Sequence, residues 1–246
     1  DSRGESAFVW KQGNVLMASV IEGLGTKNLV ADITSKITNP ERSRRTYYDI
    51  IGHDTVATII NDLISVGAKP LTINAYWAVG NNDWFKNKKR ARDLIRGWQT
   101  ACDLARLTWG GGETPTLQGI IEANSIDLGG SAIGIISSKK NLITDKKLKV
   151  NDRILLLKSN GINANGLSLA REVAKKLPKG YATKLNSPAG EGKIFDEALL
   201  TKTNIYAKLI EDLQKNEIDI HYISNITGHG LRKIMRGRPN FTYVIE

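Results

Sequence analysis

Two kinds of segment alternate along the chain: short apolar runs of strand length, and longer stretches in which apolar residues recur every three or four positions. Short apolar runs bounded by turn residues are typical of strands, whereas steps of three and four indicate the buried face of a helix. The clearest helix lies within residues 54–66, where Gly67 supplies a stop and Pro70 follows. In the first half the pattern predicts strands at 14–21, 71–79 and 130–136, and helices at 54–66 and 86–107.

The second half repeats this alternation after a polar, lysine-rich stretch at residues 137–152. Its pattern predicts strands at 153–158 and 241–245, helices at about 166–177 and 197–215, and a glycine turn at 228–230. Alternating strands and helices indicate an α/β or α+β architecture. We place a domain boundary in the lysine-rich stretch, and we expect an N-terminal domain of residues 1–137 and a C-terminal domain of residues 138–246.

The composition is that of a folded globular chain. Of the 246 residues, 41% are hydrophobic and 24% are charged, which provides for a core and excludes wholesale disorder. Every apolar run is far shorter than the roughly 20 residues needed to cross a bilayer, so we expect no membrane span. The single cysteine excludes an intrachain disulfide, and the first residues carry no secretory signal. We therefore expect a cytoplasmic location and a chain that begins inside a longer protein.

A formal net charge of +10 should attract anions such as nucleic acid, acidic lipid or small phosphorylated metabolites. Two basic runs, at residues 42–45 and 86–92, could contact a nucleic-acid backbone, but charge runs are usually solvated surface. We therefore consider nucleic acid an unlikely partner. The three histidines are scattered and lack a cysteine pair, which argues against zinc. Cys102 falls on the apolar face of its predicted helix, where a core position is expected rather than a nucleophile.

The first candidate for chemistry is the turn at residues 22–27, Glu-Gly-Leu-Gly-Thr-Lys, at the end of a predicted strand. Gly23 and Gly25 would let the backbone approach an anion closely. Glu22 adds a carboxylate, and Lys27 adds a point charge suited to phosphate. The turn lacks the third glycine of a dinucleotide fingerprint and the ending of a Walker loop. A plain tight turn also fits these residues.

The helix at 54–66 carries a second candidate. Asp54 and Asn61 are seven positions apart and lie on nearly the same helical face, with Asp62 adjacent. Carboxylate and amide oxygens suit Mg²⁺, which binds through one or two carboxylates and lets substrate phosphates complete its shell. The structural alternative makes Asp54 an N-cap and the other two residues a solvated face.

Three further glycine-bearing segments could hold a ligand. Residues 110–114, Gly-Gly-Gly-Glu-Thr, follow a predicted helix and place a carboxylate beside a hydroxyl. Residues 159–166 join a predicted strand to a helix, whose N-terminus could hold an anion. Residues 227–230, Thr-Gly-His-Gly, lead into the basic sequence Leu-Arg-Lys. The structural alternatives for these three segments are, in the same order, a helix stop, a helix cap formed by Asn165 and an ordinary loop.

In this order the segments resemble the aminoimidazole ribonucleotide synthetase family, the phosphoribosylformylglycinamidine cyclo-ligases of purine biosynthesis. The resemblance runs from about residue 14 to about 238. Its most specific part is residues 52–71, where Gly-His-Asp-Thr-Val-Ala leads through Asn-Asp-Leu to Gly-Ala-Lys-Pro-Leu. Relatives that share the fold include formylglycinamidine ribonucleotide synthetase, thiamine-monophosphate kinase, selenophosphate synthetase and a hydrogenase maturation factor.

The resemblance implies a two-domain α/β fold in which N-terminal strands complete a barrel across a homodimer, with ATP bound near that interface. It implies a C-terminal α/β domain that is truncated here. The implied reaction is phosphorylation of the amide oxygen of formylglycinamidine ribonucleotide by ATP, followed by ring closure and loss of phosphate. Because an amide oxygen leaves poorly, this reaction needs orientation, Mg²⁺ and donors for the developing charge.

The resemblance also assigns roles by position. The implied catalytic residues are Lys27, Asp62 and Asn163, and the implied metal ligands are Glu22, Asp54 and Asp62. The implied nucleotide-binding residues are Gly23, Gly25, Thr26, Lys27, Asn61, Gly112, Glu113 and Thr114. The residues implied for the substrate phosphate are Asn165, Gly166, Ser168, Thr227 and Gly228. On this basis, replacing Lys27 or Asp62 by alanine is expected to abolish ATP turnover and to leave thermal stability nearly intact.

The chain departs from the family's usual pattern at three positions: Glu22 stands for an aspartate, Asn163 for a histidine and His229 for a glycine. Two alternatives therefore stand beside the cyclo-ligase. One is another ATP-dependent kinase or synthetase of the superfamily that acts on a different small acceptor, and the other is a nucleotide-binding relative without catalysis. The expected partners are a second copy of the chain and a phosphorylated small-molecule substrate.

Overall fold

The computed structural model describes residues 2, 4–37, 45–186, 192–237 and 240–245, so most of the basic run at 42–45 lies outside the described residues. The strands are β1 (Phe8–Gln12), β2 (Val15–Gly23), β3 (Lys69–Val79), β4 (Thr108–Glu113) and β5 (Ile126–Ile136). The α-helices are α1 (Lys27–Thr34), α2 (Tyr48–Ile64), α3 (Lys88–Ala105), α4 (Leu167–Lys176), α5 (Phe195–Leu199) and α6 (Ala207–Lys215). Short 3-10 helices are η1 (Asn82–Lys86), η2 (Lys139–Asn141), η3 (Asp145–Lys147), η4 (Gly180–Ala182) and η5 (Gly230–Arg236).

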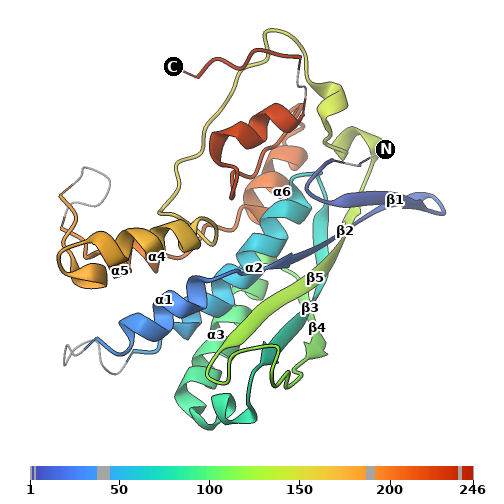
Figure 1. Cartoon of the computed structure of the whole chain (residues 1–246). Helices are drawn as coiled ribbons and strands as arrows, with labels where there is room; N and C mark the ends of the chain where they lie inside the picture. Colours follow the sequence, from blue (N-terminus) through green and yellow to red (C-terminus); the bar gives the residue numbers. More distant parts are fainter. Residues whose placement is uncertain (1, 3, 38–44, 187–191, 238–239, 246) are drawn as a thin grey trace.

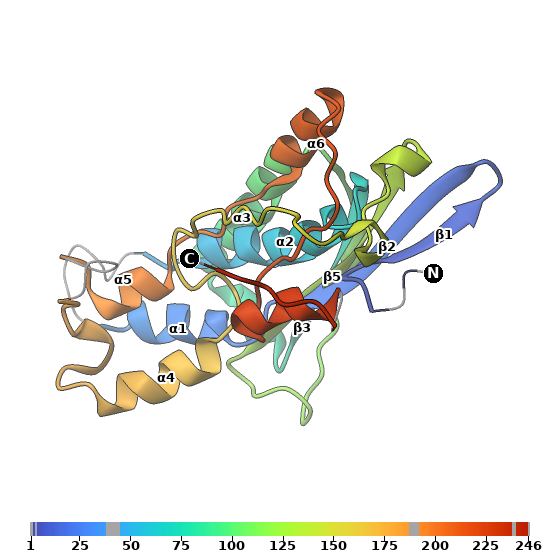
Figure 2. The ribbon, with the colours of Figure 1, turned by 90° about the horizontal axis from the view of Figure 1, so that it is seen from above.

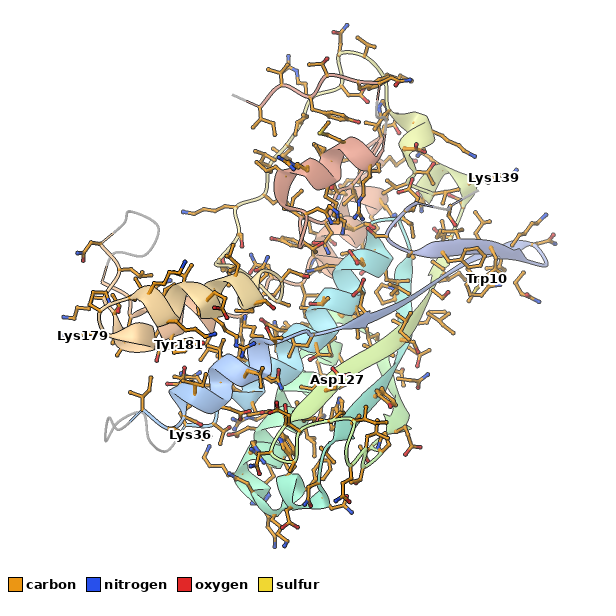
Figure 3. All side chains as sticks on the ribbon, viewed as in Figure 1. Trp10, Lys36, Asp127, Lys139, Lys179 and Tyr181 are labelled. Atoms are coloured by element: carbon orange, nitrogen blue, oxygen red, sulfur yellow. The ribbon has the colours of Figure 1, made fainter. Side chains whose placement is uncertain are left out.

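The five strands form one mixed sheet in the order β1-β2-β5-β3-β4 (Figure 1). Neighbouring strands are antiparallel except β3 and β4, which run parallel and are joined by the crossover helix α3. The hairpin of β1 and β2 forms one edge and carries Trp10, labelled in Figure 3. Gly23, at the end of β2, pairs with Gly129 of β5. The turn that follows β2 therefore leaves the sheet beside the start of β5.

Helices α2 and α3 cover one face of the sheet (Figures 1 and 2). Helix α2 is buried along nearly all its length, because the sheet, α3 and the C-terminal half of the chain each pack against it. The opposite face carries no helix among the described residues, and Ile21 and Tyr76 are exposed there. No helix in the described part of the chain is long and apolar enough to span a membrane.

Two glycines allow α2 and α3 to approach closely. A Cβ atom added to Gly52 of α2 would lie 2.3 Å from the carbonyl oxygen of Leu94, and one added to Gly97 of α3 would lie 2.0 Å from that of Asp49. Each clash is with the backbone of the opposite helix, which cannot move aside as a flexible side chain could. The crossing therefore requires glycine on both helices.

Gly97→Ala is expected to destabilise the protein by about 3 kcal/mol, because overpacking forces α2 and α3 apart. This loss should appear although alanine favours a helix by about 1 kcal/mol over glycine. Urea unfolding followed by circular dichroism measures the change. Gln99→Ala, at an exposed position of the same helix, should change the stability by about 0.5 kcal/mol or less. Equal stability of the two variants would contradict the close crossing.

In the first half, the structure confirms the strands predicted at 14–21, 71–79 and 130–136 and the helices predicted at 54–66 and 86–107. The prediction that the glycine triplet at 110–112 ends a helix is wrong, because these residues belong to β4. A Cβ atom on Gly112 would lie 2.4 Å from the carbonyl oxygen of Ala75, so glycine there permits close pairing with β3. Helix α3 ends instead at Arg106, whose φ is 56°.

In the second half, the helix predicted at 166–177 is confirmed as α4, but the single helix predicted at 197–215 is wrong. Residues 200–206 separate α5 from α6, because their backbone groups bond to side chains of α2. The strands predicted at 153–158 and 241–245 are not strands either. A strand needs a paired neighbour for stability, and neither segment has one among the described residues. The fold class is confirmed as mixed α/β with one sheet.

Candidate functional site

Lys27, the first residue of α1, has a completely buried side chain. Its Nζ lies 2.5 Å from Oδ2 of Asp54 in α2 and donates to the carbonyl oxygens of Asn163 and Thr201, each at 2.9 Å. An ammonium group has three hydrogens, so these three acceptors engage all of them. The lysine expected to face a phosphate is therefore held inside the protein, where it joins α1, α2 and two segments of the C-terminal half.

Asp54 is also completely buried, and both of its oxygens are engaged. Oδ2 accepts from Lys27, and Oδ1 accepts from the backbone N–H of Thr203 at 2.9 Å. Burial lowers the pKa of Lys27, and the charge of Asp54 opposes that shift. A buried ion pair depends on both of its members, because removing one charge leaves the other buried without compensation. Asp54, expected as a metal ligand, thus serves as the partner of Lys27 in this structure.

Asn61 lies two helical turns after Asp54 and contacts the same segment. Its Nδ2 donates to the carbonyl oxygen of Asn204 at 2.8 Å, and its Oδ1 accepts from the backbone N–H of Tyr206 at 3.1 Å. The spacing of seven predicted a shared helical face, and the structure confirms it. That face binds the backbone of residues 203–206, so Asn61 fixes a segment of the C-terminal half.

Glu22, near the end of β2, and Asp62 of α2, which we call the carboxylate pair, lie close together where β2 packs against α2. Desolvation, followed by the negative charge of Asp62, raises the pKa of Glu22 above its ordinary value, whereas Lys233 lowers it. Oδ1 of Asp62 accepts from Nδ2 of Asn225 at 2.8 Å and lies 3.5 Å from Nζ of Lys233. Neighbouring carboxylates repel each other unless a cation compensates them. The carboxylate pair is therefore a place that favours a cation.

The carboxylate pair offers two oxygen ligands of the kind that Mg²⁺ prefers. Among the described residues, no group of three or more His, Cys, Asp or Glu side chains could hold a metal ion by itself. Mg²⁺ usually takes one or two protein carboxylates and completes its shell with water and substrate phosphates. The donor set therefore fits a phosphate-bound magnesium ion better than a metal held by protein ligands alone.

The residues expected at a substrate phosphate lie close to the turn after β2. Oγ1 of Thr26 is 3.4 Å from Oγ of Ser168 in the first turn of α4. Gly166 precedes this helix with φ +80°, and a Cβ atom on Gly228 would lie 3.8 Å from Oδ1 of Asn165. The structure thus brings the turn at 22–27, the N-terminus of α4 and the glycine turn at 227–230 together. A helix N-terminus with adjacent hydroxyls is suited to an anion.

Asn163 precedes this N-terminus and adopts φ 59°. Its carbonyl oxygen accepts from Lys27, and its Oδ1 accepts from Oγ of Ser159 at 3.3 Å. The left-handed conformation, which asparagine tolerates better than most residues, turns this carbonyl toward α1. Asn163 therefore lies next to the expected phosphate site and is fixed by the buried lysine.

Gly112, Glu113 and Thr114 lie away from the other candidate residues. Glu113 pairs with Tyr76, and Tyr76 pairs with Gly129, which is the neighbour of Gly23. Three strand spacings separate the two ends of this row, about 14 Å. Paired residues point to the same face, and Tyr76 is exposed on the face opposite α2. Within one chain, the structure therefore does not bring Glu113 together with Lys27 and the carboxylate pair.

Sequence reasoning did not assign roles to several residues that build the site. Thr201 and Thr203 contribute backbone groups, which no side-chain pattern can indicate. Asn225 and Lys233 reach Asp62, and the only signal for them was a basic stretch beside a glycine turn. Cys102 is buried as expected, and burial raises the pKa of its thiol to about 12, which is unsuited to a nucleophile at neutral pH.

Comparisons with known proteins give one family. Residues 8–136 match the sequence model described as "AIR synthase related protein, N-terminal domain". The phosphoribosylformylglycinamidine cyclo-ligase of Methanocaldococcus jannaschii is 33% identical over 235 residues, which is 95% of this chain and 61% of that protein. The protein of the same name from Thermococcus kodakarensis is 34% identical over 243 residues, 99% of this chain and 65% of that protein. The chain spans about two thirds or less of these relatives.

Solved structures with the same fold are more distant in sequence. AaThiL complexed with AMPPCP and TMP has a TM-score of 0.58 and 12% identity, over 87% of this chain and 58% of that chain. Thiamine monophosphate kinase from Aquifex aeolicus has a TM-score of 0.52 and 14% identity, over 85% of this chain and 59% of that chain. At this identity, the similarity shows a shared fold and not a shared substrate.

Proposed function

Since the chain belongs to the family of AIR synthase related proteins, we propose that it is a phosphoribosylformylglycinamidine cyclo-ligase. It closes formylglycinamidine ribonucleotide to aminoimidazole ribonucleotide and converts ATP to ADP and phosphate. The observation that carries the proposal is the 33% identity to the M. jannaschii cyclo-ligase over 95% of this chain. We propose further that the enzyme is cytoplasmic, uses ATP with Mg²⁺, has no nucleic-acid partner, and has two domains, residues 1–137 and 138–246.

In this proposal Glu22 and Asp62 would hold a Mg²⁺ ion that arrives with the phosphates of ATP. When bound, this ion would supply charge neutralisation for the transferred phosphoryl group. ATP would convert the amide oxygen of the substrate into a phosphate ester, which is lost as phosphate on ring closure. Lys27 and Asp54 do not contact the ion in this proposal. Their role is indirect, because their buried ion pair fixes the turn after β2 against α2.

The phosphate of the substrate binds at the N-terminus of α4 in this proposal. Its partners there are the backbone amides of Gly166 and Gly228 and the side chains of Asn165, Ser168 and Thr227. Asn163 is next to this group and orients the reacting amide. A fixed array of donors at a helix N-terminus holds the substrate without reorganisation during the reaction.

The open face of the sheet supports a homodimer. Ile21 and Tyr76 are exposed on this face, with exposed fractions of 79% and 42%. A second copy that packs its sheet on this face would cover them and could place its own Glu113 and Thr114 near the nucleotide. The proposed site is thus completed by residues from two copies, which accounts for the distance between Glu113 and the carboxylate pair within one chain.

The test is ADP release with Mg²⁺ and three acceptors in turn: formylglycinamidine ribonucleotide, thiamine monophosphate and selenide. The proposal expects ADP release with formylglycinamidine ribonucleotide and appearance of aminoimidazole ribonucleotide. Release only with one of the other acceptors would assign a different enzyme of the superfamily. Tight ATP binding without turnover of any acceptor would assign a noncatalytic relative.

A further inference from the structure

Lys233 is a second buried lysine in the site, and its side chain faces the carboxylate pair. Its side chain is 8% exposed, and its Nζ lies 3.5 Å from Oδ1 of Asp62, which is 6% exposed. It also donates to Oγ1 of Thr227 at 3.1 Å. The positive charge of Lys233 acts on Glu22 as well. The segment η5 thus places one ammonium group against Asp62, close enough for its charge to act on Glu22.

The burial of Lys233 is selective within η5. Arg232 and Met235 on the same segment are exposed, whereas the long side chain of Lys233 is turned inward. Burying an ammonium group is costly unless an anion lies close to it. The ion pair between Lys233 and Asp62 joins η5 to the C-terminal part of α2, and in Figure 1 the red segment near the C-terminus lies above that part of the helix. The charge of the carboxylate pair therefore accounts for this inward conformation.

The contacts of Lys233 are looser than those of Lys27. Nζ of Lys27 has three acceptors within 2.9 Å, whereas Lys233 has one hydrogen bond at 3.1 Å and an ion pair at 3.5 Å. The oxygen that Lys233 faces already accepts from Asn225. A lysine stem with four rotatable bonds can leave such a position at less cost than a lysine with all three donors engaged. Lys27 is thus a fixed structural cation, and Lys233 is an exchangeable one.

We propose that Lys233 is the resident counter-cation of the carboxylate pair, and that a divalent cation must displace its ammonium group in order to bind there. This inference rests on the proposed function only in taking the carboxylate pair as the metal site. A divalent ion bound to Asp62 would lie about 2 Å from the oxygen that Lys233 faces. The ammonium nitrogen of Lys233 lies 3.5 Å from the same oxygen, so the two cations would be close neighbours beside the buried side chain of Asp62 and would repel each other. Lys233 therefore weakens metal binding before nucleotide arrives.

The test measures binding of Mn²⁺ alone, without nucleotide or acceptor, by the electron paramagnetic resonance signal of free Mn²⁺. Lys233→Met should bind Mn²⁺ about tenfold more tightly than the unchanged protein, a usual size for coupling between two ligands. Lys233→Gln keeps a hydrogen-bond donor and should show the same direction, which covers the case in which the methionine variant folds poorly. Arg232→Met removes the same charge from an exposed neighbour and should change the affinity by about twofold or less.

Unchanged or weaker Mn²⁺ binding in folded Lys233→Gln would overturn the inference. Asp62→Asn is measured in parallel and should abolish the tight binding gained in the Lys233 variants. Tighter Mn²⁺ binding in these variants, combined with no ADP release from formylglycinamidine ribonucleotide, would support the role of Lys233 and overturn the proposed function. ADP release from formylglycinamidine ribonucleotide, combined with unaltered Mn²⁺ affinity in the Lys233 variants, would support the proposed function and overturn the role of Lys233. The two failures are therefore distinguishable.

Discussion

Lys27→Met is expected to destabilise the protein by about 3–5 kcal/mol, the usual cost of removing one partner of a buried ion pair. The substitution leaves the carboxylate of Asp54 buried without its cation and leaves the carbonyl oxygens of Asn163 and Thr201 without their donor. Because those carbonyls belong to the C-terminal half, the loss should loosen its attachment to α1 and α2. Urea unfolding at neutral pH measures the change.

The control is the same substitution at a surface ion pair. Lys140 lies 3.1 Å from Glu217, and the two side chains are 62% and 79% exposed. Lys140→Met should change stability by about 1 kcal/mol or less. Combining Lys27→Met with Asp54→Asn should cost less than the sum of the two single changes, because the partners interact directly. A Lys27→Met protein as stable as Lys140→Met would contradict the structural role of this pair.

This expected loss differs from what the sequence alone implies for Lys27. A lysine after a glycine-bearing turn suggests an exposed charge whose removal affects turnover and not stability. The structure changes the stability part of that expectation, because the side chain is completely buried and all three of its donors are engaged. Loss of turnover in Lys27→Met would follow from a displaced turn at residues 22–27.

Asp62→Asn and Glu22→Gln are each expected to lower turnover about 100-fold or more while the protein stays folded. Each change removes one negative oxygen ligand of the proposed metal site, whose charge stabilisation amounts to several kcal/mol, and about 1.4 kcal/mol corresponds to a factor of ten in rate. Steady-state ADP release across a range of Mg²⁺ concentrations measures the effect. Glu172→Gln, at an exposed position on α4, should leave the rate unchanged.

Removing the charge of Glu22 should stabilise the protein, whereas removing the charge of Lys27 should destabilise it. Desolvation and the charge of Asp62 raise the pKa of Glu22 in the folded protein above its ordinary value of 4.5. A carboxyl group whose pKa is higher in the folded protein than in the unfolded chain stabilises the fold at pH values below its pKa in the unfolded chain. This stabilisation is lost as the pH rises through the pKa of the group in the folded protein. Glu22→Gln should therefore raise the melting temperature at pH 7 and leave it nearly unchanged at pH 4. A lower melting temperature at pH 7 would show that the ionised carboxylate stabilises the fold.

The sheet and its two covering helices could be predicted because their apolar periodicity is strong. Residues 54–66 and 71–79 each show one clear period, and the structure has a helix and a strand there. The glycine triplet at 110–112 was misleading, because glycine permits both a loop and a close strand pairing. The apolar run at 153–158 was misleading for another reason, since a strand needs a partner and sequence shows none.

The candidate site was predictable as a set of segments but not as a set of contacts. The turn at 22–27, the start of α4 and the glycine turn at 227–230 do meet, as their shared chemistry suggested. The burial of Lys27 could not be inferred, because two of its three acceptors are backbone carbonyls far along the chain. Glu113 could not be placed either, since its position depends on sheet order, and strand β4 was not expected.

Anomalous scattering from a crystal grown with Mn²⁺ and a nonhydrolysable ATP analogue tests whether the carboxylate pair is the metal-nucleotide site. We expect a manganese peak within bonding distance of carboxylate oxygens of both Glu22 and Asp62, with Nζ of Lys233 moved away from Asp62. A manganese peak bound to Asp54 with Lys27 displaced, or one near Glu113 without either member of the carboxylate pair, would contradict this expectation.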